Sequence, residues 1–174
     1  MRERIDRLVE YGSEAVWVST FHALCVRILR RDAEKVGFSK AFTIGSPSEQ
    51  KTLMKHIIAD TLNLDTKQYD PRSFLASISS WKNELIEPEE ALLQANAEAN
   101  PMEVAAARAY QIYQDELKKN QTMDFDDLIM KTIQLFESSP ETLEFYQRKF
   151  RYIHVDEYQD CLLYTSDAAD DRIS

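Results

Sequence analysis

Two short apolar segments set the limits on what this chain can fold into. Residues 15–20 (AVWVST) and 152–155 (YIHV) are rich in β-branched and aromatic residues, a composition typical of buried strands. The long stretch between them has the apolar spacing of helices. Two parallel strands alone do not make a stable sheet, so we expect both to belong to a larger sheet whose other strands lie outside this sequence. The pattern predicts a mainly helical α/β chain.

The helices between these segments have explicit start signals. Ser46-Pro47 followed by Glu49 predicts a capping box with proline at the first helical position. Further helices are expected to start at Asp70-Pro71, Glu87-Pro88 and Asn100-Pro101. We also expect helices over residues 2–11 and 21–36, one capped by Asp124, and one following Pro140.

Composition excludes several classes of protein. With 21 Lys and Arg against 30 Asp and Glu, the net charge of -9 disfavours coating nucleic acid by overall charge, although it leaves room for a local basic patch. The three glycines stand apart, so the sequence contains no phosphate-binding loop. Cys25 and Cys161 form no zinc-like cluster, which favours a reducing compartment, and we expect a cytoplasmic location. No apolar run reaches the roughly 20 residues of a membrane helix.

The strongest local signal for chemistry is the acid pair that follows the second apolar segment. Asp156 and Glu157 stand where the carboxyl end of a buried strand is expected. In a nucleotide hydrolase the first carboxylate takes Mg²⁺ and the second polarises the attacking water. The alternative is that acids simply end a strand at a solvated edge, and spacing alone favours this alternative.

A second candidate stands where the first apolar segment turns into helix. Thr20, Phe21 and His22 place a hydroxyl, an aromatic ring and an imidazole at a helix N-terminus, where a phosphate and a base could be held. The alternative is an ordinary helix start, with Thr20 as the cap, and the residues by themselves favour it.

Two clusters of charged residues, one basic and one acidic, have a structural interpretation that competes with a functional one. Arg27, Arg30, Arg31 and Lys35 could grip a phosphate backbone, but a solvated helix face is the more common meaning, and acids are interspersed among them. Residues 124–127 (DFDD) lack the alternating ligands and glycine of a calcium loop, so helix capping explains them better.

Taken in order, three of these motifs resemble one family. Thr20-Phe21-His22, residues 124–128 (DFDDL) and residues 155–160 (VDEYQD) are similar to motifs of the superfamily one ATP-dependent DNA helicases of the UvrD, Rep and PcrA type, most of all the PcrA type. The likeness covers residues 1–160. Three ordered motifs are far more specific than any one, so the solvated-edge interpretation of the acid pair no longer stands.

The resemblance implies a domain plan. Residues 1–21 would belong to the first RecA-like domain of a P-loop NTPase, residues 22–149 to a helical inserted subdomain, and residues 150–160 to a return into the RecA-like domain.

The resemblance also implies site roles, with ATP and Mg²⁺ as cofactors and single-stranded and duplex DNA as partners. Asp156 would hold Mg²⁺, Glu157 would act as the base, and Gln159 and Asp160 would support this site and couple it to DNA. The expected DNA contacts are Thr20, Phe21, His22, Arg30, Arg31 and Lys40.

Departures from the family pattern shape the functional prediction. The sequence has no G-x-x-x-x-G-K-[ST], and the second motor domain is missing, so we expect a fragment of a 3′–5′ DNA helicase that is itself inactive. The alternatives are an AddA- or RecB-type helicase-nuclease subunit, or a free-standing helical DNA-binding or adaptor protein.

The sequence after Asp160 is unlike the family. Residues 161–170 (CLLYTSDAAD) can be back-translated as a transposon-end adaptor used for sequencing libraries. We therefore hypothesise that residues 161–174 are translated adaptor sequence, the alternative being a natural divergent tail.

Overall fold

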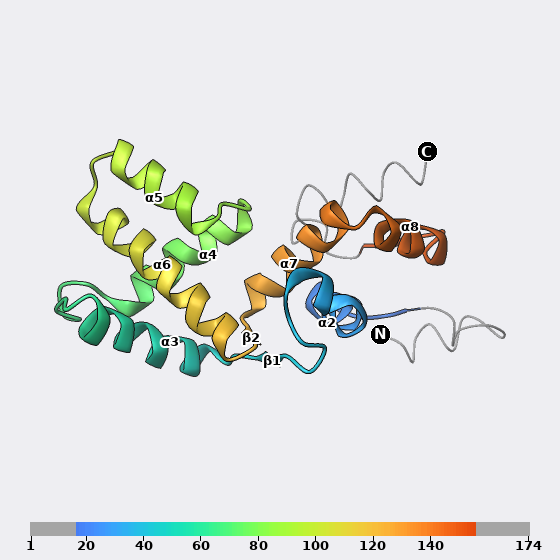
Figure 1. Ribbon diagram of the computed structural model, residues 1–174, viewed down its shortest axis with the longest axis horizontal. Helices are drawn as coiled ribbons and strands as arrows, with labels where there is room; N and C mark the ends of the chain where they lie inside the picture. The colour runs from blue at the N-terminus through green and yellow to red at the C-terminus, as the bar shows by residue number, and fades with distance from the viewer. Residues whose placement is uncertain (1–16, 156–174) are drawn as a thin grey trace.

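The computed structural model describes residues 17–155, which form a mainly helical fold (Figure 1). Its helical elements are α2 (Phe21–Asp32), η2 (Ala33–Val36), α3 (Pro47–His56), η3 (Ile57–Thr61), α4 (Pro71–Asn83), α5 (Pro88–Ala97), α6 (Pro101–Lys119), α7 (Phe125–Ser138) and α8 (Pro140–Lys149). Two short strands, β1 (Thr43–Ile44) and β2 (Thr122–Met123), pair in parallel. The predicted helix over residues 2–11 lies outside the described residues.

The helix starts confirm the sequence predictions. Proline occupies the first turn of α3, α4, α5, α6 and α8. At α3 the Ser46 hydroxyl accepts the Glu49 N–H at 3.3 Å, and the Glu49 carboxylate accepts the Ser46 N–H at 3.0 Å. These reciprocal bonds satisfy two N–H groups that a helix leaves unpaired at its start.

The predicted strand positions are wrong for the described residues. Residues 17–20 and 152–155 contain no strand, and Tyr152 is 92% exposed. A strand needs a neighbouring chain to satisfy its backbone N–H and C=O groups, and no strand among residues 17–155 lies alongside either segment. The fold class, mainly helical with two parallel strands, is nevertheless confirmed.

The two strands that do form are β1 and β2, which the sequence did not predict. Thr43 pairs with Thr122 and Ile44 with Met123. The Thr43 N–H donates to the Gln121 carbonyl, and the Gly45 N–H donates to the Met123 carbonyl, both at 2.9 Å. This pairing joins the loop before α3 to the turn before α7.

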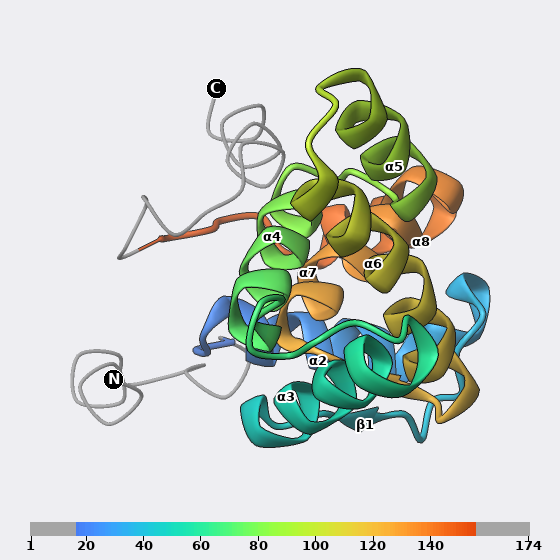
Figure 2. The same ribbon diagram turned by 90° about the vertical axis from the view of Figure 1, so that its left-hand side faces the viewer.

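The described helices surround two hydrophobic cores. The first is built by α3, η3, α4, α5 and α6, which lie together in both ribbon views (Figure 2). The second is built mainly by α2, α7 and α8. The helical region predicted as one subdomain therefore contains two cores, and its boundaries at residues 22 and 149 stay predictions.

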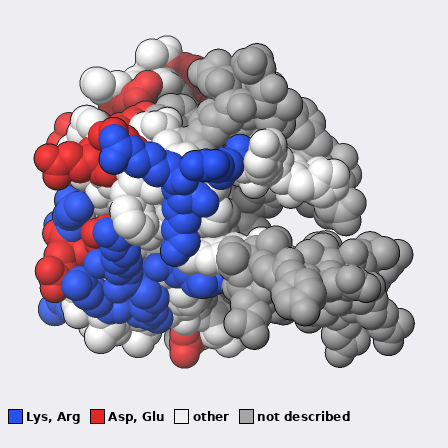
Figure 3. Space-filling model, turned by 90° about the vertical axis from the view of Figure 1, so that its right-hand side faces the viewer, with Lys and Arg blue, Asp and Glu red and all other residues white. Residues whose placement is uncertain are grey.

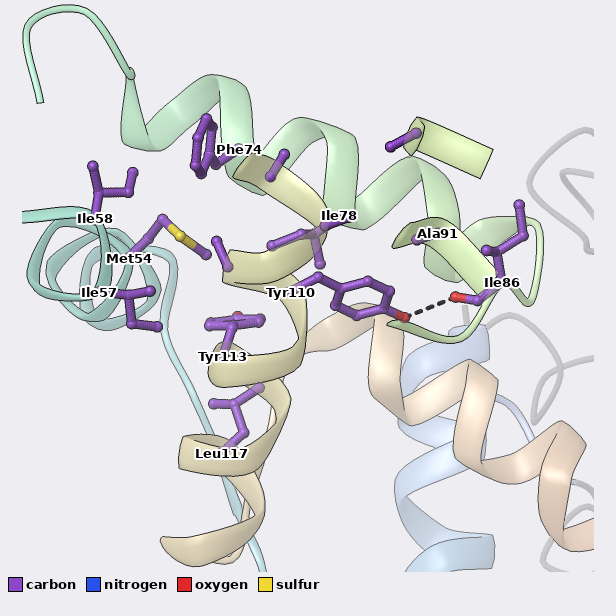
Figure 4. Packing of buried hydrophobic residues seen from close by; sticks show 14 residues of the cluster. Met54, Ile57, Ile58, Phe74, Ile78, Ile86, Ala91, Tyr110, Tyr113 and Leu117 are labelled. Carbon is purple, nitrogen blue, oxygen red and sulfur yellow. Dashed lines mark hydrogen bonds between the residues drawn. The ribbon is translucent and has the colours of Figure 1, made fainter. Parts of the chain in front are cut away.

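Tyr110 of α6 is central to the first core. Its side chain is fully buried, its ring stacks on the Trp81 ring with 5.8 Å between centroids, and its hydroxyl donates to the Ile86 carbonyl at 2.9 Å (Figure 4). Burying the ring removes apolar surface from water, and the hydrogen bond satisfies the hydroxyl that goes with it. Across residues 17–155, no helix is long and apolar enough to cross a membrane.

Candidate nucleic-acid interface

The N-terminus of α2 is capped by Thr20. Its hydroxyl accepts the Ala23 N–H at 3.2 Å, and its carbonyl accepts the Leu24 N–H at 3.0 Å. The N–H groups of Phe21 and His22 have no acceptor within residues 17–155. The plain interpretation of Thr20 as a cap is therefore confirmed, and two N–H donors remain at this helix end.

An exposed aromatic residue from another helix lies beside His22. The Phe125 ring, at the start of α7, meets the His22 ring edge to face, with 5.6 Å between centroids. Phe125 is 46% exposed although it begins an amphipathic helix. Phe21 and His22 are half-buried, and Thr20 is exposed. The structure thus brings a helix N-terminus, an imidazole and an accessible phenyl ring together.

The two helix N-termini differ in their electrostatics. The first turn of α2 contains no acidic residue, whereas the first turn of α7 contains Asp126 and Asp127 after its Asp124 cap. A helix N-terminus carries about half a positive charge, which nearby carboxylates offset. The end of α2 therefore keeps its attraction for an anion, and the end of α7 does not.

A buried ionic network holds the start of α7. The Lys82 ammonium, from α4, lies 2.7 Å from Asp124 Oδ2 and 3.0 Å from Asp127 Oδ1. The Tyr113 hydroxyl also donates to Asp124 Oδ2 at 2.9 Å, and the Gln114 amide donates to Asp127 Oδ1 at 3.1 Å. Lys82 and both aspartates are buried. The network connects α4 and α6 to the helix that presents Phe125.

The two aspartates also form the capping box of α7. The Asp127 N–H donates to Asp124 Oδ1 at 2.8 Å, and the Asp124 N–H donates to Asp127 Oδ2 at 3.2 Å. All four carboxylate oxygens therefore accept hydrogen bonds. Burial raises the pKa of Asp127, and Lys82 opposes that rise. The prediction that residues 124–127 cap a helix is confirmed, and no cluster of metal ligands occurs within residues 17–155.

The raised pKa of the Asp126 carboxyl predicts that the stability of the fold depends on pH. Burial raises the pKa of its carboxyl above the ordinary value of 3.8, and the bond from the Ser79 hydroxyl lowers it in part. The folded state therefore holds this proton more tightly than the unfolded chain does. The protonated carboxyl favours folding at low pH, and this contribution to stability is lost as pH rises from 3.8 through the raised pKa. We expect Asp126→Asn to gain stability relative to the unmodified chain between about pH 4 and about pH 7.

Urea unfolding of both proteins across this range measures that difference. Asp115→Asn, at an exposed position on α6, is the matched control. A difference between Asp126→Asn and the unmodified chain that stays constant with pH would contradict the prediction.

Two of the predicted DNA contacts, Arg30 of α2 and Lys40 in the loop after η2, lie close together. The Arg30 guanidinium donates to the Lys40 carbonyl at 2.8 Å and to the Phe42 carbonyl, and it lies 3.9 Å from the centre of the Phe42 ring. Its hydrogen bonds thus fasten residues 40–42 to α2. The Lys40 side chain is exposed. Arg31 lies elsewhere, 3.5 Å from the centre of the Phe145 ring on α8.

The predicted ATP site lies outside the described residues. Asp156, Glu157, Gln159 and Asp160 all follow Val155, the last residue described. Phe125, in contrast, is a candidate that the sequence interpretation missed, because we assigned its neighbours to capping alone. By spacing, Phe125 lies on the same helical face as Leu128 and Ile129, three and four residues later, so periodicity predicts a core position and gave no signal of its exposure.

Comparison with known proteins places the chain in a family. Residues 1–164 match the UvrD/REP helicase N-terminal domain, which extends four residues beyond the predicted end of the likeness at Asp160. The chain is 50% identical over 160 residues to "ATP-dependent DNA helicase PcrA" of Staphylococcus epidermidis, and 55% identical over 161 residues to the protein of that name in Leuconostoc citreum. Each match covers 92% of this chain and 21% of the relative, so the chain spans about a fifth of the length of these relatives. The chain belongs to the UvrD/REP helicase N-terminal domain family.

Proposed function

We propose that this chain is part of an ATP-dependent 3′–5′ DNA helicase and that the N-terminus of α2, together with the Phe125 ring of α7, contacts single-stranded DNA. The observation that carries the DNA proposal is the junction of Thr20, His22 and Phe125, where two N–H donors at a helix N-terminus with no acidic residue in its first turn lie beside an exposed ring. Donors of this kind bind phosphate, and an accessible ring stacks on a base. The names of the relatives support the same activity.

The proposed hydrolysis of ATP rests on the acid pair Asp156 and Glu157. We propose that Asp156 binds Mg²⁺ and that Glu157 accepts a proton from the attacking water, with Gln159 and Asp160 supporting them. Carboxylate oxygens are suitable Mg²⁺ ligands, so the residue types fit the ion. When bound, Mg²⁺ neutralises charge on the phosphates. Because the sequence contains no G-x-x-x-x-G-K-[ST], we expect this chain alone to bind DNA without hydrolysing ATP.

The DNA proposal predicts a defined loss of affinity. Replacing both His22 and Phe125 with alanine should weaken binding of a labelled oligo-dT by roughly 5- to 150-fold, the equivalent of about 1–3 kcal/mol for one stacked base. Fluorescence anisotropy at a fixed salt concentration measures the change. Tyr152→Ala is the matched control, because it removes a fully accessible aromatic ring far along the chain from both helix starts. Equal affinity of the double variant and the control would overturn this contact assignment.

A further inference from the structure

We propose that a second surface of this chain, the basic face formed by α2 and α8, binds the phosphate backbone of single-stranded DNA. This surface, here called the cation–aromatic ladder, consists of Trp17, Arg27, Arg31, Phe145 and Lys149. The inference rests on the proposed function in that its partner is the same DNA. It concerns side chains that contribute nothing to the junction of His22 and Phe125.

Cations and rings alternate along the ladder. The Arg27 guanidinium lies 3.4 Å from the centre of the Trp17 ring, and the Lys149 ammonium lies 4.3 Å from that centre. Lys149 is also 5.9 Å from the centre of the Phe145 ring, over which Arg31 lies at 3.5 Å. Each ring therefore holds two cations near it, and three positive charges follow one another across two helices.

The surroundings of the ladder are also basic. Figure 3 shows Lys and Arg side chains gathered on the face that contains α2 and α8, in a chain whose net charge is -9. Lys35, Arg148 and Arg151 are exposed near the same helices. Some of this charge is offset, since Arg148 pairs with Glu144, and Lys35 and Arg31 lie within 3.8 Å of Asp32 carboxylate oxygens. Arg27 and Lys149 have no ion pair with any residue from 17 to 155.

The geometry of the ladder suits phosphates better than bases. Arg27 and Lys149 share the Trp17 ring, so their charges lie within about 8 Å of each other. A strand with duplex geometry carries one phosphate per about 3.4 Å of helix rise, so two charges no more than about 8 Å apart can each meet a different phosphate, at most two apart along the strand. Cations over the rings leave little ring face for stacking, whereas the ammonium and guanidinium N–H groups can still donate. We therefore expect binding without base preference.

Nucleic acid fits this face better than a protein partner does. Arginine and aromatic residues are common in protein interfaces, but lysine is depleted there, whereas interfaces with nucleic acid are strongly positive, so the concentrated charge of this face favours nucleic acid. Arg27, Arg31 and Lys149 are all exposed, and the Arg31 side chain retains 49% of its accessible surface. Because the rings restrict where these long side chains can move, less conformational entropy is lost when a phosphate is bound.

The Arg31 end of the ladder is distinct in position from the junction at the helix starts. Nine residues separate His22 from Arg31 along α2, which corresponds to about 13 Å at 1.5 Å per residue. His22 contacts α7, whereas Arg31 contacts α8. A single strand that reaches both places would extend along α2, and each place can be altered without touching the other.

The test measures how DNA affinity depends on salt. We expect the variant with Arg31→Gln and Lys149→Gln to bind oligo-dT less tightly, with the slope of log K against log[salt] reduced by roughly 1.4, as for two lost phosphate contacts on a single strand. The control variant with Lys51→Gln and Lys55→Gln makes the same charge change at exposed positions on α3 and should keep the slope. The variant with Arg31→Lys and Lys149→Arg keeps both charges and should also keep it.

The outcomes separate the two proposals. If the slope is unchanged in the ladder variant while the His22 and Phe125 double variant loses affinity, the ladder is not a phosphate-binding surface. The proposed function then still stands. Absence of binding by the unmodified chain overturns both. Polyglutamate of the same charge as the oligo-dT serves as a competitor. If it displaces oligo-dT as well as unlabelled oligo-dT does, the surface binds any polyanion and nucleic acid is not its specific partner. Circular dichroism of each variant confirms that the helices are retained, so a lost slope reports the missing charges.

Discussion

Replacing Lys82 with alanine should lower the free energy of unfolding by about 3–5 kcal/mol, because it leaves two buried carboxylates without their cation. Lys82 is 1% exposed, and its ammonium lies 2.7 Å from Asp124 and 3.0 Å from Asp127. Folded domains are stable by only about 5–15 kcal/mol, so this change removes a large share of the total. Urea unfolding followed by circular dichroism at neutral pH measures it.

A matched set of variants isolates the cause. Lys55→Ala removes a lysine from an exposed position on α3 and should change stability by less than about 0.5 kcal/mol. Adding Asp124→Asn and Asp127→Asn to a Lys82→Met background removes the charges as well as their partner, so this triple variant should recover much of the loss. A loss below about 1 kcal/mol for Lys82→Ala would show that the carboxylates find other partners.

Replacing Glu157 with glutamine should lower ATP turnover by about 10²- to 10⁴-fold while leaving ATP affinity nearly unchanged. The expectation rests on the proposed role of Glu157 as base, since glutamine has nearly the same shape but cannot accept a proton from water. The experiment uses a chimera in which residues 1–160 replace the aligned segment of the Leuconostoc citreum relative, which this chain matches at 55% identity.

The control for this experiment is another glutamate in the same chimera. Glu144→Gln changes an exposed acid on α8 and should leave turnover within about twofold of the unmodified chimera. Steady-state turnover and nucleotide binding are measured separately, so a fall in turnover cannot be mistaken for lost affinity. If Glu157→Gln turned over at the unmodified rate, Glu157 would have no role as the base.

The helices were predictable because their signals are local. A proline at the first turn, a capping side chain before it and an apolar stripe after it lie within a few residues of one another, as at Ser46 to Glu49. The pairing of β1 with β2 gave no such signal, because each strand has only two residues and the partners are 79 positions apart. Alternation over two residues cannot be distinguished from chance.

The candidate site was predictable only in part, for the same reason. Thr20 and His22 stand in one motif, so sequence alone could group them. Phe125 lies beside His22 only because the two hydrophobic cores bring α7 against α2. Lys82 is followed by Asn83 and Glu84, residues typical of an exposed helix end, and its ion pairs are with aspartates 42 and 45 positions later. Such contacts are set by tertiary packing, which overrides local composition.

The pairing of β1 with β2 also bears on the order in which the chain folds. It closes residues 45–121 into one loop, and the first core lies wholly within that loop, whereas the second joins residues 25–42 to residues 123–146. Contacts close in sequence form before distant ones, because closing a longer loop costs more entropy. We therefore expect the enclosed core to fold first and to bring the two chain segments together. Assembly of the helix starts that carry His22 and Phe125 is then the last step of folding, so a slowly folding chain would be compact before the proposed DNA contact could form.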